Sequence, residues 1–347
     1  MNNPSGKLRI LLLSDGLPGH LSQSQGLAKW LGDRYLTESD EITVGLKVKP
    51  LARLILPYMT RFRCLAPLVL RFYRGVPDDI QGVDLILSAG GTTSFLNVAL
   101  AQHGQIPNVF LGSKRRLRSD DFSAHLTLEP TGEPHNIVMI LPPTLTDPEQ
   151  LQEKGRELRL SLGLAADEKL NMLAVGGEGA GYQYDGKAAQ QLAQLMMQEY
   201  QGSGRRWLLT TSRRTGVEFE QLLRKSVPAE LLADSVWWSE APRKVMTAYM
   251  GAADQLFVTA DSMSMIAEAI ASAKPTMVLQ PEKSQPEQRY REALQHYDHL
   301  GLCRVAELGK PSGSAPSGST AVIQARETLL DQLVKRLGLS LGPQRLS

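Results

Sequence analysis

The sequence has little cysteine and no long uninterrupted apolar run. The two cysteines, Cys64 and Cys303, lie far apart in a chain of 347 residues, and their placement indicates neither a disulfide framework nor paired metal ligands. The apolar run at residues 8–13 is too short for the core of a signal peptide, and no uncharged run reaches the roughly 18 residues of a membrane-spanning helix. We therefore expect a cytoplasmic protein with two buried thiols and no metal site.

An excess of charge of one sign is also lacking. Lysine and arginine together number 38 and aspartate and glutamate 36, which leaves a formal net charge of +2 and no reason to expect binding to nucleic acid. Neither G-x-G-x-x-G nor G-x-x-x-x-G-K-[ST] occurs anywhere in the chain. These absences disfavour a dinucleotide-dependent dehydrogenase and a P-loop nucleotide hydrolase.

Apolar runs of strand length alternate with helical patterns along most of the chain. This order is typical of parallel sheets covered by crossover helices, so the expected fold class is α/β. We expect strands in the first half at residues 8–13, 41–47, 84–88, 108–112 and 137–141, and in the second half at residues 170–177, 206–212, 235–238, 255–260 and 275–280.

A proline-rich segment without an apolar period, residues 141–150, interrupts this order. We place a domain boundary there, which predicts one Rossmann-like domain at residues 1–150 and a second at residues 151–347. A flexible loop rich in glycine, serine and proline is expected at residues 309–320. The helix expected after it, at residues 321–337, would pack back on one of the domains, and the N-terminal domain is a candidate.

The first expected strand is followed by the segment SDGLPGH. Ligands of open α/β sheets bind beyond the carboxyl ends of the strands, where Gly16 and Gly19 would allow a tight turn before a helix whose first N–H groups are free. Asp15 and His20 are therefore candidates for acid–base chemistry. The alternative is that Asp15 caps the turn and His20 is an ordinary surface residue.

Two glycine-rich segments also follow expected strands. The first, SAGGTTS, predicts an anion site at the start of a helix, although a structural turn explains it equally well. The second, VGGEGAGYQYD, is similar to a phosphate-binding loop because glycines let the backbone approach a pyrophosphate closely. The candidate residues are Gly90, Gly91 and Thr92 in the first segment and Gly176, Gly177 and Gly179 in the second.

Polar side chains follow two further strands of the second half. Ser212 ends the strand expected at residues 206–212, and Arg213 and Arg214 follow it, where a guanidinium could clamp a diphosphate or could simply lie on a solvated loop. Ser262 and Ser264 lie in the first turn of a helix, which favours an anion there. A few residues on, Glu268 interrupts a helix of small and apolar residues. Its carboxylate would need hydrogen-bond partners such as ribose hydroxyls, unless it lies at the helix edge in water.

These segments together resemble a known family. VTADSMSMIAEAIASAKPTMVL is similar to the donor-binding segment of GT-B glycosyltransferases, in which a glutamate lies seven positions before a proline, here Glu268 and Pro275. Together with SDGLPGHLSQSQGLAKWLG and RWLLTTSRRT, it resembles the mitochondrial-fission elongated-mitochondria (ELM) family, whose bacterial members are regarded as candidate glycosyltransferases. The resemblance covers roughly residues 8–300. It gives no reason to transfer the role in mitochondrial fission, which describes plant members.

The resemblance implies two Rossmann-like domains that face each other across a cleft, with the acceptor on the N-terminal side and a nucleoside-diphosphate sugar on the C-terminal side. His20, or Asp15 in its place, would take a proton from the acceptor hydroxyl. The glycine loop, Arg213 or Arg214 and the Ser262–Ser264 turn would hold the diphosphate without an obligatory metal or other cofactor, and Glu268 would bind the ribose. A sugar-nucleotide epimerase and a non-catalytic binding or scaffold protein remain alternatives.

One segment suggests where the acceptor comes from. Residues 42–77 contain seven basic residues and no acidic one, interleaved with bulky apolar side chains. The part from the first to the last of these basic residues, 47–74, can lie on an anionic membrane, which predicts contact with the inner face of the cytoplasmic membrane. The acceptor would then be a glycan or a lipid-linked molecule. The alternative is a core helix whose arginines reach water. A second basic cluster, residues 114–118, could face a phosphorylated acceptor or could lie on a solvated loop.

Overall fold

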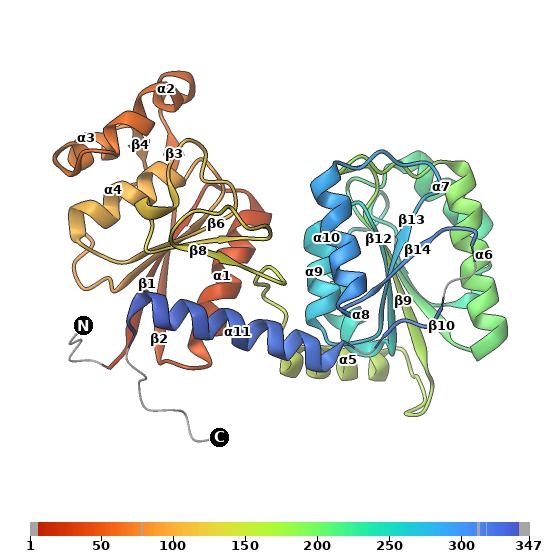
Figure 1. Ribbon diagram of the computed structural model, residues 1–347. Helices are drawn as coiled ribbons and strands as arrows, with labels where there is room; N and C mark the ends of the chain where they lie inside the picture. Colours follow the sequence, from red (N-terminus) through yellow and green to blue (C-terminus); the bar gives the residue numbers. More distant parts are fainter. Residues whose placement is uncertain (1–5, 78, 311–312, 317, 340–347) are drawn as a thin grey trace. The chain divides into compact units, whose positions relative to one another are not determined.

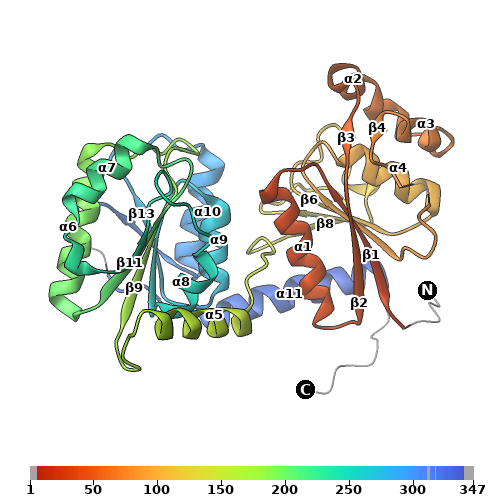
Figure 2. The same ribbon diagram turned by 180° about the vertical axis from the view of Figure 1, so that it is seen from behind.

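The computed structural model describes residues 6–77, 79–310, 313–316 and 318–339, which form two compact units. The described residues of Met1–Leu145 and Gln324–Ser347 form unit 1, and Thr146–Ile323 form unit 2 (Figures 1 and 2). The boundary expected after residue 150 falls inside α5 (Pro148–Ser161). This helix begins early because the Asp147 carboxylate accepts the backbone N–H of Glu149 at 2.9 Å and so caps its first turn.

Unit 1 is built on a parallel sheet of six strands in the order β2-β1-β5-β6-β7-β8. The strands are β1 (Leu8–Ser14), β2 (Thr37–Thr43), β5 (Leu85–Ala89), β6 (Asn108–Leu111), β7 (Ala124–Thr127) and β8 (Asn136–Val138). Helices α1 (Pro18–Gly32) and α11 (Ser319–Leu337) contribute to the core on one face of the sheet, where Leu27, Leu31 and Leu330 are fully buried. The last helix of the chain therefore packs on unit 1 from residue 324 onward.

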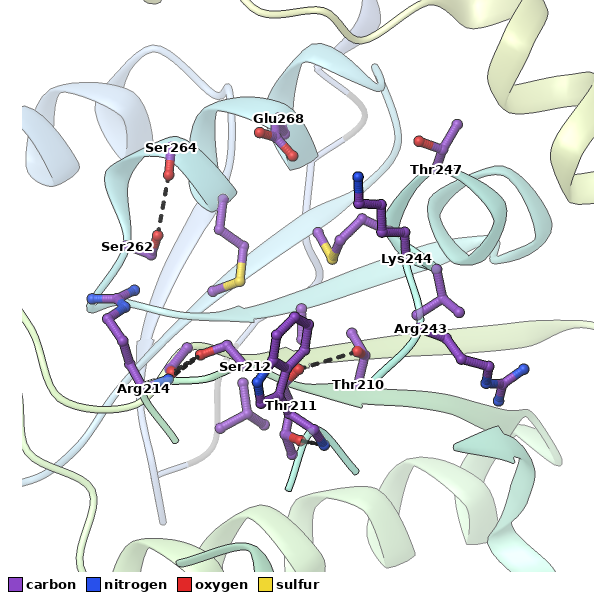
Figure 3. A pocket seen from close by; sticks show the side chains of 17 residues that line it. Thr210, Thr211, Ser212, Arg214, Arg243, Lys244, Thr247, Ser262, Ser264 and Glu268 are labelled. Atoms are coloured by element: carbon purple, nitrogen blue, oxygen red, sulfur yellow. Dashed lines mark hydrogen bonds between the residues drawn. The ribbon is translucent and has the colours of Figure 1, made fainter. Parts of the chain in front are cut away.

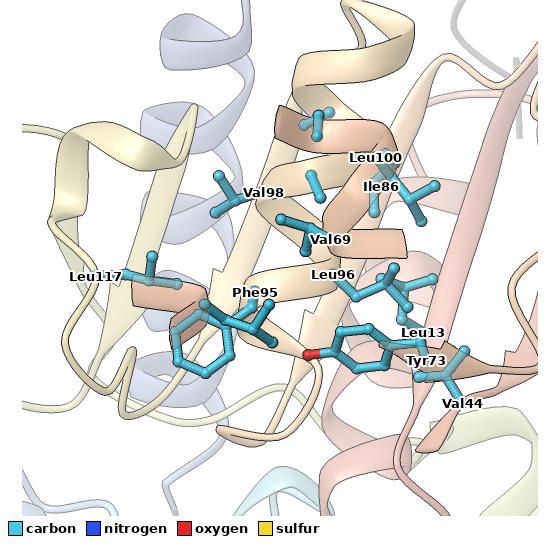
Figure 4. Packing of buried hydrophobic residues seen from close by; sticks show 14 of the residues in the cluster. Leu13, Val44, Val69, Tyr73, Ile86, Phe95, Leu96, Val98, Leu100 and Leu117 are labelled. Carbon is cyan, nitrogen blue, oxygen red and sulfur yellow. The ribbon is translucent and has the colours of Figure 1, made fainter. Parts of the chain in front are cut away.

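The other face of this sheet is covered by α4 (Ser94–Gly104) and by an insertion between β2 and β5. The insertion contains β3 (Gly45–Leu46), α2 (Lys49–Met59), the 3-10 turn η1 (Arg63–Leu65), α3 (Ala66–Leu70) and β4 (Tyr73–Arg74), and its two strands pair antiparallel. Both ribbon views show α2 and α3 together at one end of unit 1 (Figures 1 and 2). Figure 4 shows how Val69 and Tyr73 of the insertion pack with Phe95 and Leu96 of α4.

Unit 2 repeats the parallel arrangement with the strand order β11-β10-β9-β12-β13-β14. Its strands are β9 (Leu170–Val175), β10 (Arg206–Thr211), β11 (Leu232–Val236), β12 (Gln255–Thr259), β13 (Thr276–Gln280) and β14 (Arg304–Glu307). Its helices after α5 are α6 (Gly186–Ser203), α7 (Val217–Ser226), α8 (Met246–Ala252), α9 (Met263–Ala271) and α10 (Gln288–His299), and the 3-10 turn η3 (Ala229–Leu231) also belongs to this unit. The 3-10 turn η2 (Ser119–Asp121) belongs to unit 1, as η1 does. The expected α/β class with parallel sheets is confirmed.

The strand predictions fail mainly at the edges of the two sheets. The strand expected at residues 41–47 is wrong, because β2 ends at Thr43 and the chain then enters the separate strand β3. Strands β7 and β14 were not expected; both are only four residues long, and β14 also contains two charged residues. Edge strands such as β2 and β14 have fewer buried side chains, so their sequences lack the apolar runs of the central strands.

The two cysteines differ in their exposure to solvent. Cys303 is buried but Cys64 is exposed, so the prediction of two buried thiols is wrong for Cys64. This cysteine lies in η1, whose three residues include no buried side chain. The loop expected at residues 309–320 includes residues 311–312 and 317, which lie outside the described residues.

Candidate functional site

Unit 2 contains a cavity of about 460 Å³ at the carboxyl ends of β9, β10 and β12 (Figure 3). Its size is typical of small-molecule sites. Six of the residues that the sequence indicated for a donor line it: Gly176, Ser212, Arg214, Ser262, Ser264 and Glu268. Gly177, Gly179 and Arg213 do not line this cavity.

The glycines of the β9 loop are required by close packing inside unit 2. A Cβ atom at Gly176 would overlap the Asp261 carboxylate, and one at Gly177 would overlap the backbone carbonyl of Arg214. Gly177 also has a φ of +118°, which residues with a side chain rarely adopt. At Gly179 a Cβ atom would overlap the Arg214 guanidinium. The loop is therefore packed against neighbouring side chains along these three glycines.

An ion pair between Arg214 and Asp261 holds three loops together at the cavity. Arg214 Nη2 lies 2.9 Å from Asp261 Oδ2, and the Asp261 side chain has no solvent exposure, whereas that of Arg214 is 42% exposed. Thr259 Oγ1 donates to Asp261 Oδ1 at 2.6 Å and accepts the N–H of Gly176 at 2.7 Å. Burial raises the pKa of Asp261, and the hydrogen bond from Thr259 and the charge of Arg214 oppose that rise.

Helix α9 presents an open N-terminus to the cavity. Ser262 is its N-cap residue, but no side chain caps the helix. The hydroxyls of Ser262 and Ser264 lie 3.3 Å apart and hydrogen-bond to each other (Figure 3). The first N–H groups of α9 therefore have no side-chain partner among the described residues, and a helix N-terminus of this kind attracts anions such as phosphate.

Glu268 lies farther along α9 and lines the same cavity (Figure 3). Its side chain is half-buried and makes no hydrogen bond or ion pair with any of the residues that the structure describes. Burial raises the pKa of this carboxyl, and no neighbouring group offsets that effect. A carboxylate without a protein partner is costly to desolvate, so this position suits a ligand that donates hydrogen bonds.

The sequence patterns did not indicate the residues on the opposite wall of the cavity. This wall is lined by Trp238, Arg243 and Lys244 from the segment between β11 and α8, and by Met246, the first residue of α8. Arg243 pairs with Asp234 at 3.1 Å, whereas the exposed Lys244 ammonium has no ion-pair partner among the described residues. The strand expected at residues 235–238 extends past Val236, where β11 ends. The sequence pattern therefore did not indicate the residues just after this strand as candidates.

In unit 1 the structure brings Asp15, His20 and Gly90 together. His20 Nδ1 lies 3.1 and 3.0 Å from the two carboxylate oxygens of Asp15, whose side chain is only 6% exposed. A Cβ atom at Gly90, where φ is +86°, would overlap the His20 ring. In the described residues His20 Nε2 has no hydrogen-bond partner, so a neutral ring that donates from Nδ1 to Asp15 leaves Nε2 free to accept a proton.

The remaining residues that the sequence indicated for an acceptor lie in the segments just after β1 and β5. Gly16 has a φ of +79° and donates its N–H to Ser14 Oγ at 3.1 Å, whereas Gly19 adjoins open space. The carbonyl of Thr92 accepts the hydroxyl of Tyr73 at 2.8 Å. These contacts shape the turns that follow β1 and β5.

A side chain from the second basic cluster approaches this part of unit 1. Arg115 packs over Gly91 so closely that a Cβ atom there would overlap the Arg115 Nε atom. Its own backbone has a φ of +63°, which is rare for arginine. Lys114 is paired with Glu133 at 2.8 Å and Arg118 with Asp120 at 3.2 Å, but the Arg115 guanidinium has no such partner among the described residues.

No group of three or more histidine, cysteine, aspartate or glutamate side chains in the described part of the chain is arranged to hold a metal ion. No described helix is both long enough and apolar enough to cross a membrane.

The sequence itself decides the family. A family model described as mitochondrial fission ELM1 matches residues 18–328. The chain belongs to this family. A search of the curated proteins gave no match.

The ELM1 family member described here also has the fold of solved GT-B proteins. LpCGTa, solved in complex with UDP, is 12% identical, with a TM-score of 0.50 over 96% of this chain and 100% of that chain. The UDP-GlcNAc 2-epimerase of Methanocaldococcus jannaschii is 10% identical, with a TM-score of 0.50 over 94% and 93% of the two chains. MurG of Acinetobacter baumannii is 13% identical, with a TM-score of 0.47 over 97% and 96%. At these identities the likeness to the two structures with a TM-score of 0.50 shows the fold alone: α/β, GT-B-like, with two parallel six-stranded sheets.

Proposed function

We propose that this chain is a glycosyltransferase that moves a sugar from a nucleoside-diphosphate donor to a hydroxyl acceptor. The observation that carries the proposal is Glu268, a half-buried carboxylate that has no partner among the described residues and lies in the same cavity as the open N-terminus of α9. A nucleoside diphosphate satisfies both features, because its ribose hydroxyls donate hydrogen bonds and its phosphates are anionic.

The proposal assigns each part of the donor to one part of the cavity. Ribose hydroxyls donate to Glu268, and the diphosphate lies at the N-terminus of α9 with Ser262 and Ser264. The Lys244 ammonium, which has no ion-pair partner in the described chain, adds positive charge, and Arg214 lines the cavity while it stays paired with Asp261. The charge of the diphosphate is thus balanced by protein groups, without an obligatory metal or cofactor. Trp238 adds flat apolar surface for a nucleobase.

Acceptor activation is assigned to unit 1. His20 Nε2 accepts the proton of the acceptor hydroxyl as its oxygen attacks the anomeric carbon of the sugar. The bond between that carbon and the diphosphate oxygen breaks, and the nucleoside diphosphate leaves with the electron pair. Asp15 holds the His20 ring through Nδ1 and stabilises the imidazolium that forms. The acceptor in this proposal is a glycan or a lipid-linked glycan, handled in the cytoplasm.

Thermal unfolding against a panel of nucleoside diphosphates, with and without Mg²⁺, tests the donor site. A ligand at a hundred times its dissociation constant stabilises the folded state by about 2.7 kcal/mol, and Glu268→Ala should reduce that gain. Glu153→Ala, on the exposed side of α5 in the same unit, is the matched control and should respond as the wild type does. If no diphosphate stabilises the wild type, the transferase proposal fails and a scaffold role replaces it.

A sugar-nucleotide epimerase is the second candidate, favoured by the fold shared with the M. jannaschii epimerase. An epimerase would use the same nucleotide site but would need no acceptor. Incubation with the donor alone separates the two functions: an epimerised nucleotide sugar supports the epimerase, and transfer only when an acceptor is added supports the transferase.

A further inference from the structure

The outer face of α2 is apolar, although it faces solvent. Leu51, Leu54 and Tyr58 lie at helical spacing and are 45%, 60% and 56% exposed. Phe62, just after the helix, is 59% exposed. A surface helix normally has polar residues on its outer face, and large apolar side chains gathered in one exposed segment mark an interaction site.

The inner face of α2 already supplies the contacts that the fold needs. Ala52 and Leu56 are fully buried and Met59 is nearly so, all three in the core cluster between the insertion and α4. Packing inside unit 1 explains these three residues. It leaves Leu51 and Leu54 in solvent on the other face, where a partner outside unit 1 would bury them.

Positive charge surrounds these exposed apolar residues. Exposed basic side chains lie before and after these apolar residues in the insertion. None of these basic side chains forms an ion pair in the described part of the chain. Arg61 lies over the Tyr58 ring, 5.3 Å from its centroid. Residues 42–77 contain seven basic residues and no acidic one, whereas the whole chain has a formal net charge of only +2. The rest of the chain is therefore net negative. We call the following set the insertion surface: Val48, Leu51, Leu54, Tyr58, Phe62 and Leu68 with Lys47, Arg61, Arg63, Arg71 and Arg74.

We propose that the insertion surface docks on an anionic membrane. Leucine, phenylalanine and tyrosine side chains would enter the boundary between headgroups and acyl chains, while the arginines and Lys47 contact anionic headgroups. Charge complementarity selects this occupant, because a bilayer with anionic lipids offers negative charge and an apolar layer on the same flat surface. The side chains of Lys49 and Arg53, in the same helix, lie outside the described residues.

The insertion is attached beside the loops that the proposed reaction uses. Its strand β4 carries Tyr73, whose hydroxyl donates to the carbonyl of Thr92 at 2.8 Å. At the base of the insertion, the N–H of Val44 donates to the carbonyl of Ser14 at 2.8 Å, just before Asp15. A bilayer on the insertion surface would therefore lie on the part of unit 1 that carries the acceptor-side turns. As a consequence that rests on the proposed transferase function, the acceptor would be lipid-linked.

Flotation of the full chain with vesicles tests this surface. The wild type should float with vesicles of phosphatidylcholine and phosphatidylglycerol at low salt, and should stay unbound with phosphatidylcholine alone or at high salt. Leu54→Ser/Phe62→Ser should lower the partition coefficient at least tenfold. Arg61→Gln/Arg63→Gln should lower it about fivefold for each charge removed. Leu160→Ser, which removes a leucine that is 75% exposed on α5 of unit 2, should bind as the wild type does.

The exposed Cys64 provides a direct readout, because it lies in η1 within the insertion while Cys303 is buried. A thiol-reactive, environment-sensitive fluorophore on Cys64 should shift to shorter wavelength when anionic vesicles are added. Equal thermal midpoints of the variants and the wild type would show that the substitutions at exposed positions leave the fold intact.

Three outcomes would overturn the proposal. The wild type does not float with anionic vesicles at low salt, or the insertion-surface variants float as well as the wild type. Alternatively, Leu54→Ser/Phe62→Ser abolishes a dimer measured by light scattering while vesicles remain unbound, in which case a second copy covers this face. Vesicle binding uses no nucleotide, so flotation without any nucleotide-induced thermal shift would reject the transferase proposal and leave the membrane inference standing.

Discussion

Arg214 and Asp261 form an ion pair in which the carboxylate has no solvent exposure and the guanidinium faces the cavity of unit 2. Their Nη2 and Oδ2 atoms lie 2.9 Å apart, and a Cβ atom at Gly176 or Gly179 would overlap one partner or the other. The loops after β9, β10 and β12 thus meet at this pair, which adds to the hydrogen bonds that Ser212 and Thr259 make with Gly176. Removing one partner leaves the other charge with little compensation.

Arg214→Ala should therefore destabilise the protein even without ligand. Because Asp261 is buried and Arg214 is partly screened by solvent, the free energy of unfolding should fall by about 1–3 kcal/mol, measured by urea denaturation. The double variant Arg214→Ala/Asp261→Asn should recover part of this loss, because the unpaired charge is removed. Arg213→Ala, next to it on the exposed loop, is the control. Equal losses for the single and double variants would contradict this role of the pair.

The Glu268 carboxyl should lower the free energy of unfolding of the ligand-free protein at neutral pH. Burial raises the pKa of this carboxyl in the folded state, so the folded protein holds the proton more tightly than the unfolded chain does. The contribution of Glu268 to the free energy of unfolding therefore declines as the pH rises from below the pKa of this carboxyl in the unfolded chain to above its pKa in the folded protein. Glu268→Gln should have a higher thermal midpoint than the wild type at pH 7 and a similar one at pH 4. The reverse order at pH 7 would indicate a protein partner for the carboxylate.

Gly90 should be required for the position of His20. Gly90→Ala places a methyl group where the His20 ring lies, in a backbone conformation with φ of +86°, so the ring must move away from Asp15. Turnover should fall on the order of a hundredfold, as for loss of a general base in His20→Ala, while the thermal shift with a nucleoside diphosphate persists. Gly19→Ala is the matched control, because a Cβ atom there meets open space. A Gly90→Ala variant with full turnover would remove His20 from the mechanism.

Arg115 should act on the acceptor and not on the donor. Its guanidinium has no partner among the described residues and lies over Gly91, next to the glycine against which His20 packs. Arg115→Ala should raise the KM for an anionic acceptor about tenfold, as expected for the loss of one charge-assisted contact, with the nucleotide-induced thermal shift unchanged. Arg116→Ala provides the comparison at the neighbouring exposed position. If both substitutions change the KM equally, the effect is one of general charge and not of Arg115 itself.

The sequence was sufficient for the central strands and for six of the residues that line the cavity of unit 2. Strands such as β9 and β12 are buried along almost their whole length, so their apolar runs are visible without a structure. The residues just after them are exposed to ligand by the geometry of a parallel sheet. Gly176, Ser212, Ser262 and Glu268 were found in this way, and the structure brings them to one cavity.

The opposite wall of that cavity could not be found by the same reasoning. Trp238 and Lys244 belong to an irregular segment between β11 and α8, and the strand expected at residues 235–238 ends two residues beyond the true end of β11 and so includes the tryptophan. The backbone N–H of Trp238 donates to Thr211 Oγ1 at 2.8 Å, a contact between distant segments that no local pattern encodes. The roles of Gly177 and Gly179 were equally hidden, because they are defined by the distant Arg214.

The sequence by itself determined the α/β class, the central strands, the family motifs and the absence of acidic residues from 42–77, because these depend on local periodicity and composition. Only the tertiary structure decided that Asp15 holds His20 against Gly90 and that Arg214 is paired with a buried Asp261. It likewise decided that Glu268 has no partner in the part of the chain that the structure describes. It also decided which face of α2 is left in solvent. Each of these depends on residues far apart in the chain, whose distances are set by packing and not by sequence neighbours.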